Sequence, residues 1–232
     1  MTSARKPHGI SISWLLIGGV GGTSAYNQID YSAGTTPLTV NLGVTDTFGT
    51  VTSSEFDTDI LQTADKVFGG SGADVFTRGT FNSSQFGSFA AFEGMGGDDT
   101  FTGVVGKATR VSFSRAPTGV TVDFGLSGTG TALDGFGGTD TLIDVDRMLG
   151  SKFDDTIFGS DRSIFEEFRP RGGDDFIDFT TIGLETLDQD IHNALRASFG
   201  TVADYFTDID HPITILENSN LVVVKAKYFH VN

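Results

Sequence analysis

One short run of residues constrains both the backbone conformation and the ligand chemistry of this chain. Residues 69–77 read GGSGADVFT, with glycine at positions one, two and four, aspartate at position six and a large apolar residue at position eight. Glycine permits the backbone angles of a tight loop, and the carboxylate of Asp74 supplies a hard oxygen of the kind that calcium prefers. The pattern therefore predicts a six-residue loop followed by a short strand, with Phe76 facing a core.

Weaker copies of this nonapeptide begin at residues 94, 135, 150 and 170. Each keeps the aspartate and the apolar position in register. In the copy that begins at residue 150, Phe153 replaces the glycine at position four, and the last copy lacks the glycines at positions one and two. Residues 18–23 form a further candidate, but Thr23 occupies its aspartate position and we expect it to bind nothing. We interpret the N-terminal apolar stretch as this degenerate repeat rather than as a signal peptide. The predicted side-chain ligands of a metal are Asp74, Asp99, Asp140, Asp155 and Asp175.

A longer repeat contains the short one. Residues 31–43 match residues 113–125, and residues 58–61 match residues 139–142. In both halves the same interval separates successive aspartates, from Asp59 to Asp74 and from Asp140 to Asp155. Internal duplication of this kind is typical of stacked repeat proteins. We therefore predict two related units, at about 29–104 and 111–183.

The composition excludes several functions. The net charge is −15, which disfavours nucleic acid as a partner because phosphate binding needs clustered basic side chains. The chain has no cysteine, so disulfides and thiolate metal sites are excluded, and no apolar run is long enough for a membrane span. No H-E-x-x-H motif occurs, and we interpret the acidic pair Glu166 and Glu167 as part of a solvated loop. We predict no catalytic residues.

The chain divides into three regions. Residues 1–16 are expected to be poorly ordered, and residues 17–183 alternate short strands with glycine- and aspartate-rich loops. Leu184, Leu187, Ile191 and Leu195 recur at helical spacing and predict a helix over 184–198. Residues 213–216 and 221–224 are predicted to form a hairpin. Because the end of a strand array exposes unpaired backbone and apolar side chains, we expect residues 184–232 to form a cap.

Together, these motifs resemble the hemolysin-type calcium-binding proteins, known as RTX proteins, over roughly residues 17–232. The resemblance implies an all-β parallel β-roll, a solenoid similar to a right-handed β-helix, with calcium between loops stacked on one edge. In that family the aspartates and nearby backbone carbonyls hold the ions. Carried over to this chain, the glycines of such a site are Gly70, Gly72, Gly97 and Gly173.

The resemblance also implies that the protein is secreted and acts outside the cell. The C-terminal region is similar in layout to an uncleaved signal for type I secretion, which makes the secretion apparatus an expected partner. Folding would then follow calcium binding after export. The unequal spacing of the aspartates departs from the family, so we expect insertions to interrupt the roll.

Three functions stay open at this point. We favour a non-enzymatic, calcium-binding β-roll of a secreted bacterial protein. The second is an extracellular recognition or adhesion module, in which one flat strand face binds a glycan, ice or a cell surface. A regular ladder of exposed threonine or aromatic residues would favour it, but we expect the insertions to interrupt such a ladder. The third is the non-catalytic tail of a secreted enzyme.

Overall fold

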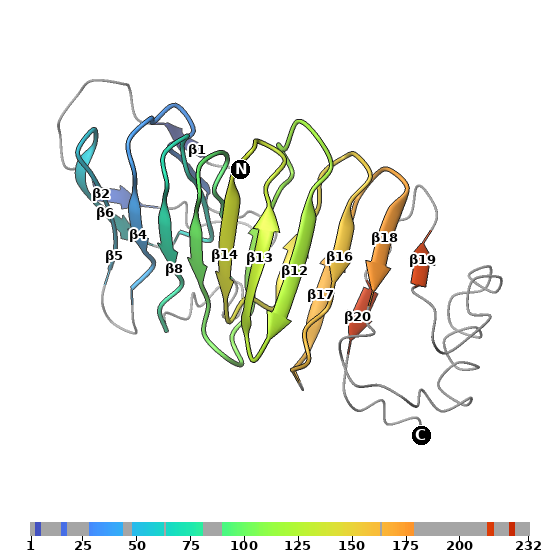
Figure 1. Ribbon diagram of the computed structural model, residues 1–232. Helices are drawn as coiled ribbons and strands as arrows, with labels where there is room; N and C mark the ends of the chain where they lie inside the picture. Colours follow the sequence, from blue (N-terminus) through green and yellow to red (C-terminus); the bar gives the residue numbers. More distant parts are fainter. Residues whose placement is uncertain are drawn as a thin grey trace.

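The computed structural model describes residues 28–43, 48–62, 64–80, 90–162 and 164–178, together with the backbone of four short strands outside these ranges. This described part is all-β and contains no helix, and its strands form two mostly parallel sheets (Figure 1). The predicted helix at 184–198 lies outside the described residues.

The smaller sheet has eight strands and the larger has twelve. In spatial order, the eight-stranded sheet contains β1 (Ser3–Arg5), β3 (Gln28–Asp30), β7 (Lys66–Phe68), β9 (Ala90–Glu93), β11 (Thr109–Ser112), β15 (Arg147–Leu149), β17 (Glu166–Arg169) and β20 (Val223–Lys225). The twelve-stranded sheet contains β19 (Ile213–Ile215), β18 (Asp175–Asp178), β16 (Thr156–Phe158), β12 (Thr121–Leu126), β13 (Thr129–Leu133), β14 (Thr139–Ile143), β10 (Thr100–Thr102), β8 (Val75–Thr77), β4 (Thr39–Asn41), β5 (Gly49–Ser53), β6 (Asp57–Gln62) and β2 (Leu15–Ile17).

From β1 to β18 the chain passes back and forth between the two sheets. The exceptions are two antiparallel meanders, β4–β5–β6 and β12–β13–β14, which stay within the twelve-stranded sheet. We expected insertions to interrupt the roll, and the two meanders do break its parallel order, although the sheet itself stays continuous. The inserted strands pair with their neighbours and widen the sheet, so their backbone groups are satisfied within it.

The core lies between the two sheets and contains the predicted apolar positions. The alternation of strand side chains places one side inward, and the residue two places after each predicted aspartate is at most 1 % exposed. The Phe76 and Phe101 rings stack with centroids 5.0 Å apart, and Phe92 from the opposite sheet lies 5.2 Å from Phe76. Burying side chains of this size contributes about 1.5–3 kcal/mol each. This set consists of Phe76, Phe101, Leu142, Ile157 and Ile177.

The pattern of strand pairing repeats along the chain. Strand β3 pairs with β7 as β11 pairs with β15, and β4 pairs with β8 as β12 pairs with β16. Similarly, the pairs β7–β9 and β8–β10 correspond to β15–β17 and β16–β18. We call β3–β10 (residues 28–102) the first unit and β11–β18 (residues 109–178) the second unit.

Short strands extend both ends of the array. Strand β1 and most of β2 lie within residues 1–16, and they pair in parallel with β3 and β6. At the other end, β19 and β20 lie at the predicted strand positions, but they do not form a hairpin with each other. Strand β19 pairs antiparallel with β18 and β20 with β17, so each extends one sheet.

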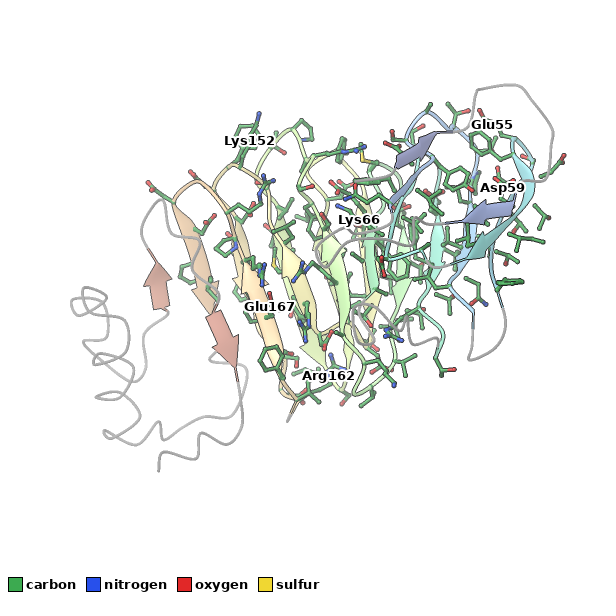
Figure 2. The ribbon with its side chains drawn as sticks, turned by 180° about the vertical axis from the view of Figure 1, so that it is seen from behind. Glu55, Asp59, Lys66, Lys152, Arg162 and Glu167 are labelled. Carbon is green, nitrogen blue, oxygen red and sulfur yellow. The ribbon has the colours of Figure 1, made fainter. Side chains whose placement is uncertain are left out.

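The outer face of the eight-stranded sheet carries a network of charged side chains (Figure 2). Glu167 pairs with Arg110 at 3.0 Å and with Arg147 at 2.8 Å, and Lys66 pairs with Glu93 at 2.7 Å. Glu166 is also buried and accepts a hydrogen bond from the Ser160 hydroxyl. The interpretation of Glu166 and Glu167 as a solvated loop was therefore wrong, because neighbouring arginine and serine side chains compensate their burial within β17.

Candidate metal centre

The predicted loops all lie along one edge of the two-sheet array. Loops 69–74, 94–99, 150–155 and 170–174 each cross from the eight-stranded to the twelve-stranded sheet, and loop 134–138 joins β13 to β14 at the same edge. Glu55 and Lys152 mark this edge in Figure 2. The loops stack directly, since Ser71 N donates to Gly34 O at 3.0 Å and Gly96 N donates to Gly70 O at 3.2 Å. We call this the loop edge.

A ladder of buried aspartates runs through the loop edge. The backbone N–H of Leu38 donates to Asp74 Oδ1 at 2.8 Å, that of Asp74 donates to Asp99 Oδ1 at 2.7 Å, and that of Asp99 donates to Asp140 Oδ1 at 3.0 Å. Each carboxylate thus accepts the N–H that precedes a strand in the neighbouring layer. The structure brings these three predicted site residues together in one continuous row.

A second, shorter row repeats this arrangement in the second unit. The N–H of Val120 donates to Asp155 Oδ1 at 3.0 Å, and the N–H of Asp155 donates to Asp175 Oδ1 at 2.9 Å. Strands β13 and β12 lie between β14 and β16 and so separate the two rows. Directly before β12 the chain has Val120, where an aspartate precedes β8 and β10. The five predicted aspartates therefore form two groups rather than one series.

The first glycine of the motif is required by the way the aspartate side chain folds back. A Cβ atom added to Gly69 would overlap Asp74 Oδ2, and one added to Gly94 would overlap Asp99 Oδ2. The same relation holds between Gly150 and Asp155 Oδ2. The spacing of five residues between glycine and aspartate thus reflects direct contact between the loop backbone and the carboxylate.

The four predicted glycines have different roles. Gly97 and Gly173 have φ angles of 114° and 110°, in the region that favours glycine. Gly72 packs against the backbone of Pro37 in the neighbouring loop, while the carbonyl of Gly70 is occupied by the hydrogen bond from Gly96. Among these four, Gly97 is the one whose carbonyl oxygen lies against Gly138 of the neighbouring loop.

Burial and mutual repulsion raise the pKa values of the ladder aspartates. Burial raises the pKa of Asp99 to about 9, and the nearby carboxylates of Asp140, Asp74 and Asp134 add to this effect. Burial likewise raises the pKa of Asp140 to about 7 and those of Asp74 and Asp175 to about 6, and it raises the pKa of Asp155. Negative charge is therefore least tolerated at Asp99, in the middle of the longer row.

Sequence reasoning missed Asp134, which faces the same region. Its Oδ1 accepts hydrogen bonds from the N–H groups of Phe136, Gly137 and Gly138, each at 2.8 Å. The residue lies one position before the nonapeptide copy and so falls outside the motif. An aspartate directly before a glycine-rich turn is a known turn signal, and this could have identified it.

Two carboxylate oxygens near this point have no hydrogen-bond partner within the described chain. They are Asp99 Oδ2 and Asp134 Oδ2, and both residues are 1 % exposed. A Cβ atom added to Gly138 would overlap the carbonyl oxygen of Gly97 and lie 2.8 Å from Asp134 Oδ2, so this glycine leaves space beside the Asp134 carboxylate and the Gly97 carbonyl. Carboxylate and carbonyl oxygens are the donors that calcium accepts.

The described residues do not bring three or more carboxylate or imidazole side chains into a group that could hold a metal. A cation at this point would therefore need backbone carbonyls in addition to the two carboxylates, as the resemblance to RTX loops implies. We call the region between loops 94–99 and 134–138 the junction site, because it lies where the two units meet.

Comparisons with known proteins add no assignment. No protein-family model, curated protein or solved structure matches the chain. Among the described residues, no helix has the length and apolar character needed to cross a membrane.

Proposed function

We propose that this chain is a parallel β-roll of the RTX kind, whose loop edge binds calcium, and that it acts as a non-enzymatic module of a secreted protein. The observation that carries the proposal is Asp99. Its carboxylate is buried, has one unpartnered oxygen and has a pKa raised to about 9. Asp134, whose charge acts on Asp99, contributes a second unpartnered oxygen.

Burying a carboxylate without a partner is unfavourable, and the site must be neutralised by a proton or by a cation. A proton neutralises one charge, whereas Asp74, Asp140 and Asp134 all add negative charge around Asp99. A divalent cation offsets two negative charges at once, and a bound cation is often the largest local charge in its site. The charge at the junction site therefore favours a divalent cation over a single proton.

Calcium suits the available donors better than magnesium. It accepts 6–8 oxygen ligands at irregular geometry, while magnesium requires a compact octahedron. Asp99, Asp134 and the carbonyl of Gly97 would hold the ion at the junction site. The ion would screen the repulsion that opposes stacking of the two loops, so binding would be coupled to folding. This coupling agrees with the proposal that the chain folds after export through a type I apparatus into a calcium-rich medium.

Thermal unfolding followed by circular dichroism tests the proposal. With a dissociation constant near the ~10⁻⁴ M of extracellular modules, tenfold excess calcium contributes about 1.4 kcal/mol per site. Chelation should lower the melting temperature, and magnesium should not restore it. Asp99→Asn should abolish the calcium response, whereas Asp161→Asn, at an exposed position on the opposite edge, should retain it. Identical melting curves in calcium and in chelator would overturn the proposal.

A further inference from the structure

The outward side chains of the twelve-stranded sheet form a regular grid of two rows. The grid spans seven adjacent strands in the order β6, β5, β4, β8, β10, β14 and β13, and neighbouring positions are paired in register. The first row is Thr58, Thr52, Thr39, Val75, Thr100, Thr141 and Thr131. The second row is Ile60, Thr50, Asn41, Thr77, Thr102, Ile143 and Thr129. We call these residues the threonine face.

The two meanders build this face rather than interrupt it. Strands β5 and β6 come from the first meander and β13 and β14 from the second, and Figure 1 shows them side by side with β8 in one sheet. Each adds at least one outward threonine in register with its neighbours. The expectation that insertions would break a ladder of exposed threonines was therefore wrong. Each insertion adds two strands that pair in register, so their threonines stay on the outer face of the sheet.

The threonine face is uncharged in a strongly acidic chain. The protein has a net charge of −15, and the outer face of the opposite sheet carries the ion pairs of Glu167 and Lys66. The grid contains no charged side chain and no aromatic ring. A charged partner would gain nothing from this face, and a sugar ring would find no aromatic surface on which to stack. The face is complementary to a neutral partner.

The spacing of the threonines is set by the sheet. Strands lie about 4.8 Å apart and alternate residues about 6.6 Å apart along each strand. The β-branched threonine side chain has a restricted χ1 angle, so its hydroxyl and methyl groups are held in place before binding. The outward positions are exposed or half-buried, and Val75 and Ile60 are each 40 % exposed. At ten of its fourteen positions the face thus presents the hydroxyl and methyl group of a threonine in an ordered two-dimensional array.

We propose that the threonine face binds ice. Water oxygens at crystal faces of ice repeat at distances close to both spacings of the grid, and an ice surface is neutral, flat and periodic. Hydroxyl groups can take the place of water molecules in such a lattice, while the methyl groups favour release of the remaining disordered water. A face with irregular spacing or charged side chains would match none of these properties.

Adsorption of the full chain to growing ice, and the thermal hysteresis of its solutions, test this proposal. Thr141→Lys and Thr100→Lys place a long charged side chain in the middle of the first row and should abolish both effects. Thr80→Lys makes the same change at an exposed position outside the grid and should leave them unaltered. Circular dichroism in calcium shows whether each variant keeps the fold, which is expected because the substituted side chains point away from the core.

Two results would overturn the proposal. One is that the folded parent protein neither adsorbs to ice nor shows hysteresis. The other is that both lysine variants in the grid, shown to be folded, retain the parent's activity. Binding to an insoluble polysaccharide without adsorption to ice would be one form of the first result. The outcome is separable from the calcium proposal, because ice adsorption with identical activity in chelator would overturn only the role of calcium.

Discussion

The two units share one backbone plan but neutralise their central carboxylates differently. In the first unit, Asp74 Oδ2 accepts a hydrogen bond from Gly70 N at 2.9 Å, and the next aspartate in the row has an unpartnered oxygen. In the second unit, Ser151 replaces Gly70. Its N–H donates to Asp155 Oδ2 at 2.8 Å, and its hydroxyl donates to Asp155 Oδ1 at 2.7 Å. The second unit thus adds a hydroxyl donor to Asp155, whose counterpart in the first unit, Asp74, accepts backbone hydrogen bonds from Leu38 and Gly70.

The two units also differ in how far the pKa of the last loop aspartate is raised, and this difference follows from the position of the aspartate in its row rather than from the shape of its loop. Loops 94–99 and 170–174 have the same backbone bends, with φ of 74° at Met95 and 89° at Arg171, although Pro170 replaces the first glycine. Yet burial and neighbouring carboxylates raise the pKa of Asp99 to about 9 and that of Asp175 only to about 6. Asp99 lies between other ladder aspartates, whereas Asp175 lies at the end of its row. The need for a cation therefore arises where the units meet.

Replacing the first aspartate of each row should have the largest effect and should show that the ladder itself is common to both units. Asp74→Ala would leave the buried N–H groups of Leu38 and Gly70 without an acceptor. Each unsatisfied group costs about 1–3 kcal/mol, so the expected loss is about 2–6 kcal/mol. Asp155→Ala should cost a similar amount, since it would leave the N–H groups of Val120 and Ser151 without an acceptor. Denaturant unfolding in calcium measures both.

The matched control is Asp154→Ala, which changes the exposed neighbour of Asp155. Its only described bond is to the exposed N–H of Asp174, which water can replace, so the expected loss is small. If the Asp74 and Asp155 variants unfold at the same denaturant concentration as this control, the ladder does not stabilise the fold.

The pH dependence of the calcium-free protein should separate the two rows. Ladder carboxyls have folded pKa values raised above the ordinary 3.8, so the folded state binds more protons and its stability falls as pH rises. Stability should be greatest near pH 4 and decline through pH 6 to 9, by up to about 1.4 kcal/mol per pH unit for each protonated carboxyl. Calcium, which binds the ionised form, should oppose this decline.

Asp99→Asn should remove the part of this decline that lies above pH 7, because burial raises the pKa of Asp140 only to about 7 and those of Asp74 and Asp175 to about 6. Asp175→Asn should affect only the part between about pH 4 and pH 6, which lies between the ordinary and the raised pKa of this carboxyl. Thermal melts in chelator at several pH values measure the profile. A calcium-free parent that becomes more stable from pH 5 to pH 9 would contradict the assigned direction of these pKa shifts.

The sequence was sufficient to predict the all-β class, the buried apolar positions and the alignment of the five aspartates on one edge. These features depend on local rules: glycine spacing determines the loop, and the residue two places after the aspartate must face inward. The motif was informative because Gly69, Gly94 and Gly150 contact the carboxylates of their own loops, so sequence spacing and spatial contact coincide.

The features that were not predicted depend on contacts between distant residues. Asp134 joins the junction site only because β14 pairs with β10, and the nonapeptide does not encode this pairing. The burial of Glu167 depends on arginines from three other positions in the chain. The meanders were misread because an insertion that continues a sheet and one that leaves it have similar glycine-rich turns. The Thr-x-Thr alternation at 50–52, 129–131 and 139–141 was the available signal.

The smallest expected effect comes from Ser151→Gly, which restores the residue of the first unit at the corresponding position of the second. The variant keeps the backbone N–H bond to Asp155 but loses the hydroxyl donor, so it should destabilise the protein by about 1 kcal/mol. Asp155 would then resemble Asp74, whose two carboxylate oxygens accept backbone hydrogen bonds, and it lies outside the junction site. Calcium should therefore not recover this loss, and thermal melts of variant and parent across a calcium titration measure the difference. A destabilisation that shrinks as calcium rises would show instead that the serine hydroxyl takes the place of an ion in the second unit.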